Sequence, residues 1–255
     1  MLSIKNLTKR FAGLVAVDGV TFDAEASKVT ALIGPNGAGK TTVLSMLSGL
    51  MKPTDGSATL DGKEITSLKA HLVAKLGVRR SYQNLQMFED MSVLEVVMTG
   101  AHATGSAGSI AAMFRLPGVR REERDIEATA RKALDRVGLQ SDLFEREAIS
   151  LPYGLQRRVE FARALAAGPR ILLLDEPAAG LNATETRELA DLISKLRADG
   201  MTVLLIEHDM DLVMRLSDRI AVMNFGKLIA MGTPREIRQN PKVIEAYLGV
   251  EEEDA

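Results

Sequence analysis

The feature that most constrains this chain is a glycine-rich loop placed between an apolar segment and a segment with helical character. Residues 28–33 read KVTALI, residues 34–40 read GPNGAGK, and residues 41–49 read TTVLSMLSG. The first segment predicts a compact buried strand, and the last predicts a helix that begins directly after the loop. A strand, a glycine-rich loop and a helix in this order are typical of α/β folds.

The loop fits the pattern G-x-x-x-x-G-K-[ST] from Gly34 to Thr41. Backbone N–H groups can surround phosphate oxygens only where no Cβ atom intervenes, which explains glycine at positions 34, 37 and 39. The start of the helix adds free N–H groups and the positive end of its dipole. Lys40 supplies a charge for the β- and γ-phosphates, and Thr41 offers a hydroxyl oxygen to Mg²⁺. The sequence therefore predicts a site for a nucleoside triphosphate.

Two acidic residues follow a second apolar run, ILLL at residues 171–174. Carboxylates at the carboxyl end of a parallel strand face the crevice where ligands bind. We expect Asp175 to hold Mg²⁺ through water, and Glu176 to orient or deprotonate the attacking water. His208 ends the next apolar strand, TVLLIE. It is either a structural histidine or a hydrogen-bond donor to the γ-phosphate and the water.

Two further candidates carry little signal by themselves. Gln83 follows a segment that reads as a strand, and its amide oxygen would suit Mg²⁺ or the attacking water. Phe11 precedes the small-residue stretch AGLVAV. It would stack on adenine or pack in the core, and spacing favours neither.

Composition excludes several classes of function. The 255 residues carry 32 Lys and Arg against 34 Asp and Glu, so no overall positive field would attract nucleic acid. Trp is absent, and Phe and Tyr total only 10, which argues against base-stacking surfaces. Absence of Cys excludes disulfides, Cys-ligated metals and thiol catalysis. Apolar runs are far shorter than the ~18 residues of a membrane helix, so we expect any membrane association to be peripheral and through a partner.

Apolar strands alternate with helical patterns in the second half of the chain, which predicts a parallel sheet covered on both faces. Leu2, Ile4 and Leu7 predict one edge strand near the N-terminus, and residues 58–60 predict another. Residues 84–167 read as largely helical, and a hairpin is expected near Phe225 and Gly226. Residues 100–125 read as a surface insertion; the alternative is contact with a partner or a membrane surface through Ile110, Met113, Phe114 and nearby arginines.

In this order the motifs resemble the nucleotide-binding subunit of an ABC transporter. The matching elements are Phe11, the Walker A residues 34–42, Gln83 in the Q-loop, residues 151–156 as signature, Walker B at 171–176, the D-loop at 179–182 and His208 in the H-loop. RRSYQNLQMFEDMSVLEVV, LLLDEPAAGLNATET and GTPREIRQNPKVIEAYLG look like the LivG-type ATPase of branched-chain amino-acid importers.

The resemblance implies an ABC ATPase fold, which is a RecA-like P-loop NTPase core with an antiparallel β-subdomain and a helical subdomain. It implies one domain over 1–255, with the core and β-subdomain in 1–84 and 168–255 and the helical subdomain in 85–167. The implied catalytic residues are Glu176, His208 and Gln83, and the implied Mg²⁺ ligands are Thr41, Gln83 and Asp175. The implied ATP-binding residues are Phe11, Gly34, Pro35, Asn36, Gly37, Ala38, Gly39, Lys40, Thr41, Thr42 and Gly154.

The signature segment departs from the family pattern. LSGGQ is replaced by Leu151-Pro152-Tyr153-Gly154-Leu155, so the seryl hydroxyl that reaches the partner's γ-phosphate is missing. We expect backbone N–H groups and the helix dipole to make this contact instead, with Pro152 in the first turn and Gly154 allowing close approach.

The resemblance also implies partners: a second ABC ATPase subunit, identical or sister, two permease subunits and, indirectly, a substrate-binding protein, at the cytoplasmic face of the membrane. Leu85, Met87 and Phe88 would line a groove for a permease helix or form the core of the helical subdomain. A urea or amide importer and a non-transport assembly ATPase remain alternatives. A GTPase switch is disfavoured because the base-recognition motif N-K-x-D is absent.

Overall fold

The computed structural model describes residues 1–81, 90–102 and 117–248. The chain divides into two compact units. The first comprises Met1–Arg80 with Arg170–Ala255, and the second is Ser81–Pro169. Among the described residues, no helix has both the length and the apolar character that crossing a membrane requires.

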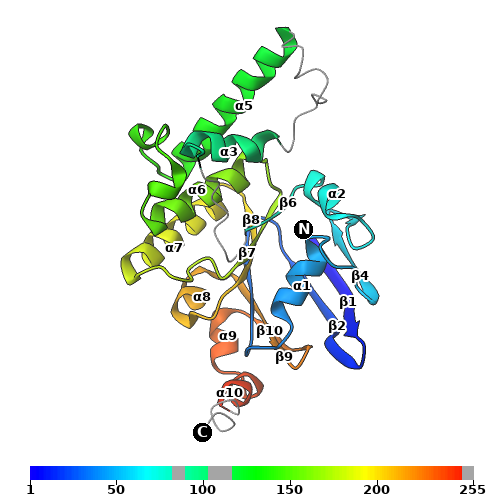
Figure 1. The fold of residues 1–255 in the computed structure, drawn as a ribbon. Coiled ribbons are helices and arrows are strands. Elements are labelled where there is room, and N and C mark those ends of the chain that lie inside the picture. The colour runs from blue at the N-terminus through cyan, green and yellow to red at the C-terminus, as the bar shows by residue number, and fades with distance from the viewer. Residues whose placement is uncertain (82–89, 103–116, 249–255) are drawn as a thin grey trace. The chain divides into compact units, whose positions relative to one another are not determined.

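A six-stranded sheet forms the centre of the first unit (Figure 1). Every neighbouring pair except β9–β10 is parallel, which confirms the predicted parallel sheet. The antiparallel pair is the hairpin expected at Phe225 and Gly226. In spatial order the strands are β10 (Lys227–Gly232), β9 (Arg219–Asn224), β3 (Val29–Ile33), β8 (Thr202–Ile206), β7 (Ile171–Asp175) and β6 (Val78–Arg80).

The central strands are apolar throughout because both faces of the sheet are covered. In β3, Leu32 belongs to a core cluster shared with α1 (Lys40–Leu47), whereas Ala31 and Ile33 belong to a cluster on the opposite face. Successive side chains of a strand point to opposite faces, so a strand buried on both sides needs an unbroken apolar run. The helices that contribute to the opposite cluster are α8 (Met210–Leu216), α9 (Pro234–Arg238) and α10 (Pro241–Leu248).

A four-stranded antiparallel sheet packs over α1 in the same unit. Its order is β2 (Leu14–Ala24), β1 (Leu2–Phe11), β4 (Asp55–Leu60) and β5 (Lys63–Glu64). The expected edge positions of β1 and β4 are therefore wrong, since both lie inside the sheet. The alternating pattern reveals that one face is buried, but it does not report how many strand neighbours supply hydrogen bonds.

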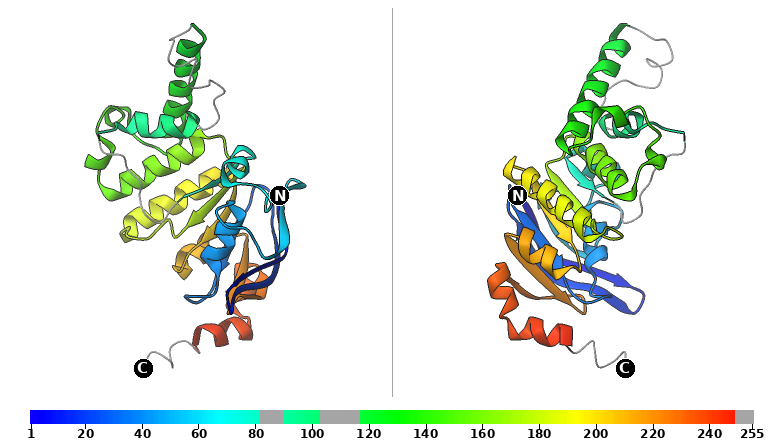
Figure 2. Two further views of the ribbon diagram at one scale, coloured as in Figure 1. Left: turned by 45° about the vertical axis from the view of Figure 1, so that its right-hand side comes forward. Right: turned by 90° about the vertical axis from the view of Figure 1, so that its left-hand side faces the viewer.

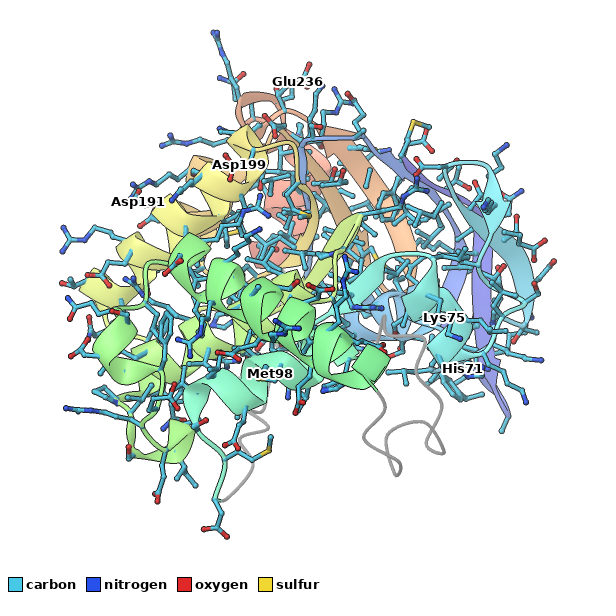
Figure 3. All side chains as sticks on the ribbon, turned by 90° about the horizontal axis from the view of Figure 1, so that it is seen from above. His71, Lys75, Met98, Asp191, Asp199 and Glu236 are labelled. Atoms are coloured by element: carbon cyan, nitrogen blue, oxygen red, sulfur yellow. The ribbon has the colours of Figure 1, made fainter. Side chains whose placement is uncertain are left out.

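Two helices of this unit turn polar residues to solvent. α7 (Ala183–Ala198) begins at a capping box formed by Asn182 and Glu185, and it buries Leu189, Ile193 and Leu196. Asp191 of α7, and His71 and Lys75 of α2 (Ala70–Lys75), lie on the exposed sides of their helices (Figure 3). These amphipathic patterns follow the usual helical spacing.

The second unit is helical, as the sequence predicts (Figure 2). Its helix α3 (Val93–His102) packs against α5 (Pro117–Arg136) and α6 (Tyr153–Ala166). Two short 3-10 turns, η1 (Ser141–Leu143) and η2 (Ala148–Ser150), connect α5 to α6. Apolar residues at helical spacing are buried, namely Ile126, Ala130, Ala133, Leu134 and Val137 on α5 or directly after it, and Val159, Ala162, Leu165 and Ala166 on α6.

Candidate nucleotide-binding site

Three of the predicted site segments in the first unit meet because the strands before them are parallel and in register. Ile206 of β8 pairs with Leu32 of β3 on one side and with Asp175 of β7 on the other. The segments that follow these strands therefore leave the sheet at the same edge. They are the glycine-rich loop, the acidic pair and the segment with His208.

Backbone from two distant strands encloses the glycine-rich loop. Gly34 has φ +148°, and a Cβ atom there would lie 2.1 Å from the carbonyl oxygen of Met223 in β9. Gly39 has φ +98°, and its Cβ would lie 2.4 Å from the carbonyl oxygen of Ala16 in β2. Both positions combine a conformation that L-residues rarely adopt with no room for a side chain. Glycine is required there to build the loop, in addition to the reason predicted from phosphate access.

Lys40 holds the loop in a closed curve. Its Nζ donates to the carbonyl oxygens of Gly34 at 2.7 Å and Pro35 at 2.9 Å. Burial lowers the pKa of Lys40, while the charges of Glu176 and Asp175 oppose that shift. The two carboxylates at the ends of neighbouring segments are thus the charges that act on the Lys40 ammonium.

The helix after the loop starts without a side-chain cap. α1 begins at Lys40, its N-cap residue is Gly39, and no side chain of the described residues bonds to this end. Its first intrahelical bond runs from the N–H of Val43 to the carbonyl of Gly39. The preceding N–H groups are the donors that a helix leaves unsatisfied at its start. A phosphate is a suitable acceptor for them.

We expect Gly34→Ala to disrupt the loop far more than Gly37→Ala does. At Gly37 the φ is +77°, but no heavy atom lies within 4 Å of the position that a Cβ atom would take. The Gly37 variant should therefore show mainly backbone strain, about 1 kcal/mol of unfolding free energy. The Gly34 variant must also move the backbone at Met223, so we expect a loss of ATP affinity of at least tenfold. Chemical denaturation and nucleotide titration of both variants measure this; equal behaviour of the two would contradict the steric argument.

Asp175 is already paired with a cation. It ends β7, is 5% exposed, and its Oδ2 lies 2.6 Å from Nη2 of Arg80. Nη1 of Arg80 donates to Oγ of Ser45 in α1 at 3.1 Å. Arg80 ends β6, the strand beside β7, and was not among the predicted site residues. The only signal for it is that two arginines precede Gln83 at the end of a parallel strand.

Glu176 and His208 face each other. His208 Nδ1 lies 3.8 Å from Oε2 of Glu176, and the N–H of Glu176 donates to the carbonyl of Ile206 at 2.9 Å. Glu176 has φ +47°, a left-handed conformation that is uncommon for a residue with a side chain. Such conformations cluster at functional sites, where the surrounding structure maintains them. The structure thus brings together Lys40, Asp175, Glu176 and His208.

Phe11 is not a core side chain. It is the last residue of β1 and 42% exposed. Nζ of Lys9 lies 5.2 Å from the centroid of its ring. This exposure argues against packing in the core, and stacking on adenine stays a prediction.

Several predicted residues lie outside the described part of the chain. Gln83 is one of them, as are Leu85, Met87 and Phe88 of the predicted permease groove. Ile110, Met113 and Phe114 of the insertion also fall outside it.

The helix of the signature segment begins one residue later than expected. Pro152 precedes the first turn of α6 as its N-cap residue, and its carbonyl accepts the N–H groups of Leu155 and Gln156. The prediction that Pro152 occupies the first turn is therefore wrong, and Tyr153 occupies that position. Proline fits here because it lacks a donor and its φ of −53° suits the entry to a helix.

The side chains around Gly154 are held within the second unit. Tyr153, 40% exposed, accepts a hydrogen bond on its hydroxyl from Nη2 of Arg157 at 2.9 Å. Nε2 of Gln156 donates to the carbonyl of Leu151 at 2.7 Å. Gly154 lies in the first turn of α6. Tyr153 and Arg157 were not predicted to matter, and their spacing of four residues is the only sequence signal for the contact.

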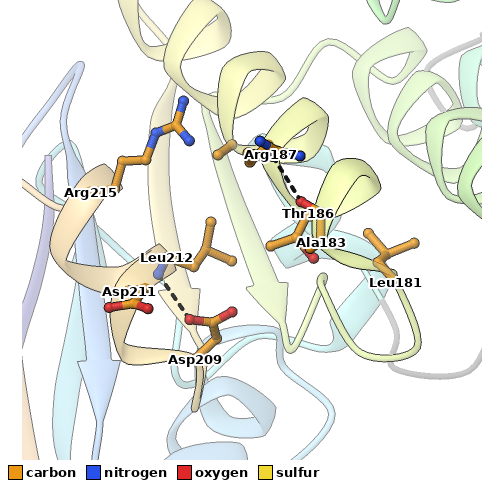
Figure 4. Close-up of a pocket in the computed structure, with 9 residues that line it drawn as sticks. Leu181, Ala183, Thr186, Arg187, Asp209, Asp211, Leu212 and Arg215 are labelled. Atoms are coloured by element: carbon orange, nitrogen blue, oxygen red, sulfur yellow. Dashed lines mark hydrogen bonds between the residues drawn. The ribbon is translucent and has the colours of Figure 1, made fainter.

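A cavity of about 610 Å³ lies between α7 and α8 (Figure 4). Its lining includes Leu181, Arg187, Asp211 and Arg215, and none of residues 34–42. Asp209 uses its side chain to cap α8, accepting the N–H of Leu212 at 3.0 Å. This cavity is therefore separate from the glycine-rich loop.

The fold and the loop define a P-loop nucleotide-binding protein of the α/β class. The sequence profile of the ABC transporter family matches residues 17–179, and that of the branched-chain amino acid ATP-binding cassette transporter matches residues 227–253. The chain belongs to the ABC transporter family, in which it is an ATPase.

Relatives and solved structures agree with this. The chain is 48% identical to the high-affinity branched-chain amino acid transport ATP-binding protein BraF of Pseudomonas aeruginosa, over 98% of both chains. It is 45% identical to LivG of Escherichia coli, also over 98% of both. Its structure resembles an ATP-binding cassette in the ADP conformation, with TM-score 0.85 and 32% identity over 98% of both chains. A dimeric bacterial ABC transporter cassette matches with TM-score 0.77 and 25% identity, over 92% of this chain and 99% of that one.

Proposed function

We propose that this protein hydrolyses ATP at its glycine-rich loop to power the import of branched-chain amino acids. The observation that carries the chemical part is the convergence of Lys40, Asp175, Glu176 and His208 at one edge of the sheet. The names of BraF and LivG, and the C-terminal match at 227–253, support the choice of cargo. The division into a core of 1–84 with 168–255 and a helical subdomain of 85–167 is part of the same proposal.

The loop and α1 bind the triphosphate. The N–H groups at the start of α1 and in the loop donate to phosphate oxygens, and Lys40 neutralises the β- and γ-phosphates. Phe11 stacks on adenine through its exposed face. The residues that contact the nucleotide are Gly34, Pro35, Asn36, Gly37, Ala38, Gly39, Lys40, Thr41 and Thr42.

The proposed metal ligands suit Mg²⁺. The hydroxyl of Thr41, the carboxylate of Asp175 and the amide oxygen of Gln83 are hard oxygen donors, which this ion prefers. When bound with ATP, Mg²⁺ neutralises charge that develops on the phosphate oxygens. Before Mg²⁺ binds, the guanidinium of Arg80 balances the negative charge of the buried Asp175 carboxylate. Such a partner is needed because an unpaired buried charge is strongly destabilising.

Hydrolysis then depends on Glu176 and His208. Glu176 accepts a proton from the attacking water, His208 donates a hydrogen bond to the γ-phosphate, and Gln83 orients the water. Since Glu176 and His208 already face each other at 3.8 Å, closure of the site requires little rearrangement between them.

The second half of each site comes from a second ATPase subunit, identical or sister. The start of α6 with Gly154 presents backbone N–H groups to the partner's γ-phosphate. The dimeric cassette among the similar structures supports this arrangement. The ATPase dimer binds two permease subunits at the cytoplasmic face of the membrane, and a substrate-binding protein delivers the amino acid on the other side.

Transport in vesicles tests the function. The ATPase with its permease, reconstituted together with the binding protein, is expected to hydrolyse ATP faster when leucine, isoleucine or valine is supplied. Stimulation by urea or amides instead would favour the related importers. ATP hydrolysis that no permease stimulates would favour a non-transport assembly factor.

Pro152→Ser is expected to leave the ATPase rate within about threefold of the parent. Pro152 makes no side-chain cap, and its carbonyl contacts with Leu155 and Gln156 do not depend on the ring. Serine is also a favoured N-cap residue, so the helix should form equally well. Steady-state hydrolysis by the assembled transporter measures this. Complete loss of activity would show that the proline itself is needed at this contact.

A further inference from the structure

A buried carboxylate that the proposed mechanism does not use lies directly beside His208. Glu207 follows β8 and is 1% exposed. Burial raises the pKa of Glu207, and hydrogen bonds from the N–H groups of Ala178, His208 and Asp209 lower it. A buried carboxyl group is normally retained only where it is paired or hydrogen-bonded, so its partners indicate what it does.

The two oxygens of Glu207 bind two different segments. Oε1 accepts the N–H of Ala178 at 2.8 Å, and Oε2 accepts the N–H of His208 at 3.1 Å. Ala178 lies in the turn after Glu176, where the N–H of Ala179 donates to the carbonyl of Glu176 at 3.1 Å. The Glu207 side chain therefore connects the turn after Glu176 to the backbone of His208 by hydrogen bonds.

Glu207 also faces the ring of His208. Nδ1 of His208 lies 3.8 Å from Oε2 of Glu207 and 3.8 Å from Oε2 of Glu176. The imidazole is 68% exposed, so packing alone does not fix its direction. The buried carboxylate of Glu207 and the carboxylate of Glu176 at the site both face the same ring nitrogen.

We propose that Glu207 is a positioning residue that holds His208 toward Glu176 and couples both to the turn at Ala178. This rests on the proposed roles of Glu176 and His208 and adds a residue that acts only through them. A carboxylate suits this place because the N–H groups of Ala178 and His208 each bind a different one of its oxygens. Glutamine has one oxygen and one NH₂ group, so one of the two N–H donors would face another donor.

Glu207→Gln tests the inference in the assembled transporter. We expect kcat for ATP hydrolysis to fall about tenfold or more, because small displacements of reacting groups are costly, while ATP affinity changes by less than about threefold. Glu207→Asp keeps both acceptor oxygens on a shorter side chain and should retain more activity than the glutamine variant. Glu236→Gln makes the same chemical change at the capping box of α9 and should behave as the parent. An unchanged kcat in Glu207→Gln would overturn the inference.

A double-mutant cycle separates positioning from general structural support. If Glu207 acts through His208, adding Glu207→Gln to His208→Ala should reduce kcat by less than about twofold further. If Glu207→Gln lowers kcat in the His208→Ala variant by the same factor as in the parent protein, the inference would be overturned. A different result would contradict the proposed function itself. That function predicts slow ATP hydrolysis by His208→Ala and by Glu176→Gln with Glu207 intact, so parental rates in these two variants would contradict it.

Amide hydrogen exchange gives a readout that does not depend on activity. In Glu207→Gln we expect faster exchange at the N–H of Ala178 or His208, because one of them loses its acceptor, with unchanged exchange in β3. Unchanged protection at both positions would also overturn the inference.

Discussion

Lys40→Ala is expected to reduce kcat/KM for ATP by at least about 100-fold. The ammonium donates to the carbonyls of Gly34 and Pro35 in the structure, and in the proposed function it also supplies positive charge to the phosphates. Alanine removes both, so the loop loses its internal closure at the same time as the phosphates lose their counter-charge. Lys40→Arg would keep the positive charge. Its larger, planar guanidinium group does not match the position of Nζ, which lies 2.7 Å from the carbonyl oxygen of Gly34 and 2.9 Å from that of Pro35.

Nucleotide titration and steady-state hydrolysis, with Mg²⁺ present, measure the effect of Lys40→Ala. Lys63→Ala is a matched control because Lys63 lies exposed on the short strand β5. The control is expected to bind and hydrolyse ATP as the parent does. ATP affinity of Lys40→Ala within about threefold of the parent would contradict the role of Lys40 in binding.

Glu176→Gln is expected to lower kcat by about 10²- to 10⁴-fold with ATP affinity nearly unchanged. Glutamine preserves the size of the side chain and the backbone bond to Ile206, but it cannot accept the proton of the attacking water. ATP should then remain intact between two subunits. The variant is expected to accumulate as an ATP-bound dimer.

Single-turnover hydrolysis and size-exclusion chromatography with ATP measure these two effects. Glu245→Gln, at an exposed position of α10, serves as the control. Hydrolysis by Glu176→Gln at the parental rate would show that Glu176 is not the base. Slow hydrolysis without the ATP-bound dimer would contradict only the proposed link between ATP and subunit contact.

The sequence predicted the local parts of the site well because their causes are local. An unbroken apolar run specifies a strand buried on two faces, and a glycine-rich loop followed by Lys40 and Thr41 specifies the start of α1. Parallel strands then bring Asp175 and His208 to the same edge without any knowledge of side-chain contacts.

The parts that were not predicted depend on contacts between distant segments. Arg80 pairs with Asp175 because β6 and β7 are neighbours, an order that the sequence does not state. Glu207 looked like part of an apolar strand, and its role emerges only from the backbone donors that surround it. The left-handed conformation of Glu176 has no sequence signal, since such a residue is usually glycine or asparagine.

Errors in element position have the same origin. Strand β1 was expected at an edge but has neighbours on both sides. Pro152 was expected inside the helix but precedes it, because its ring tolerates both positions and the carbonyl bonds from Leu155 and Gln156 decide between them.

The enclosure of the glycine-rich loop has a consequence for biosynthesis. Gly226 donates its N–H to the carbonyl of Ala38 and accepts the N–H of Asp18 on its own carbonyl, and Ser27 bonds to Thr202, which is 175 residues further along. A nascent chain on the ribosome thus has its phosphate-binding segment long before it has the hairpin of β9 and β10, whose backbone contacts the loop. We expect ATP to stabilise this protein only after the hairpin of β9 and β10 has left the exit tunnel, so that nucleotide cannot assist the earlier stages of folding.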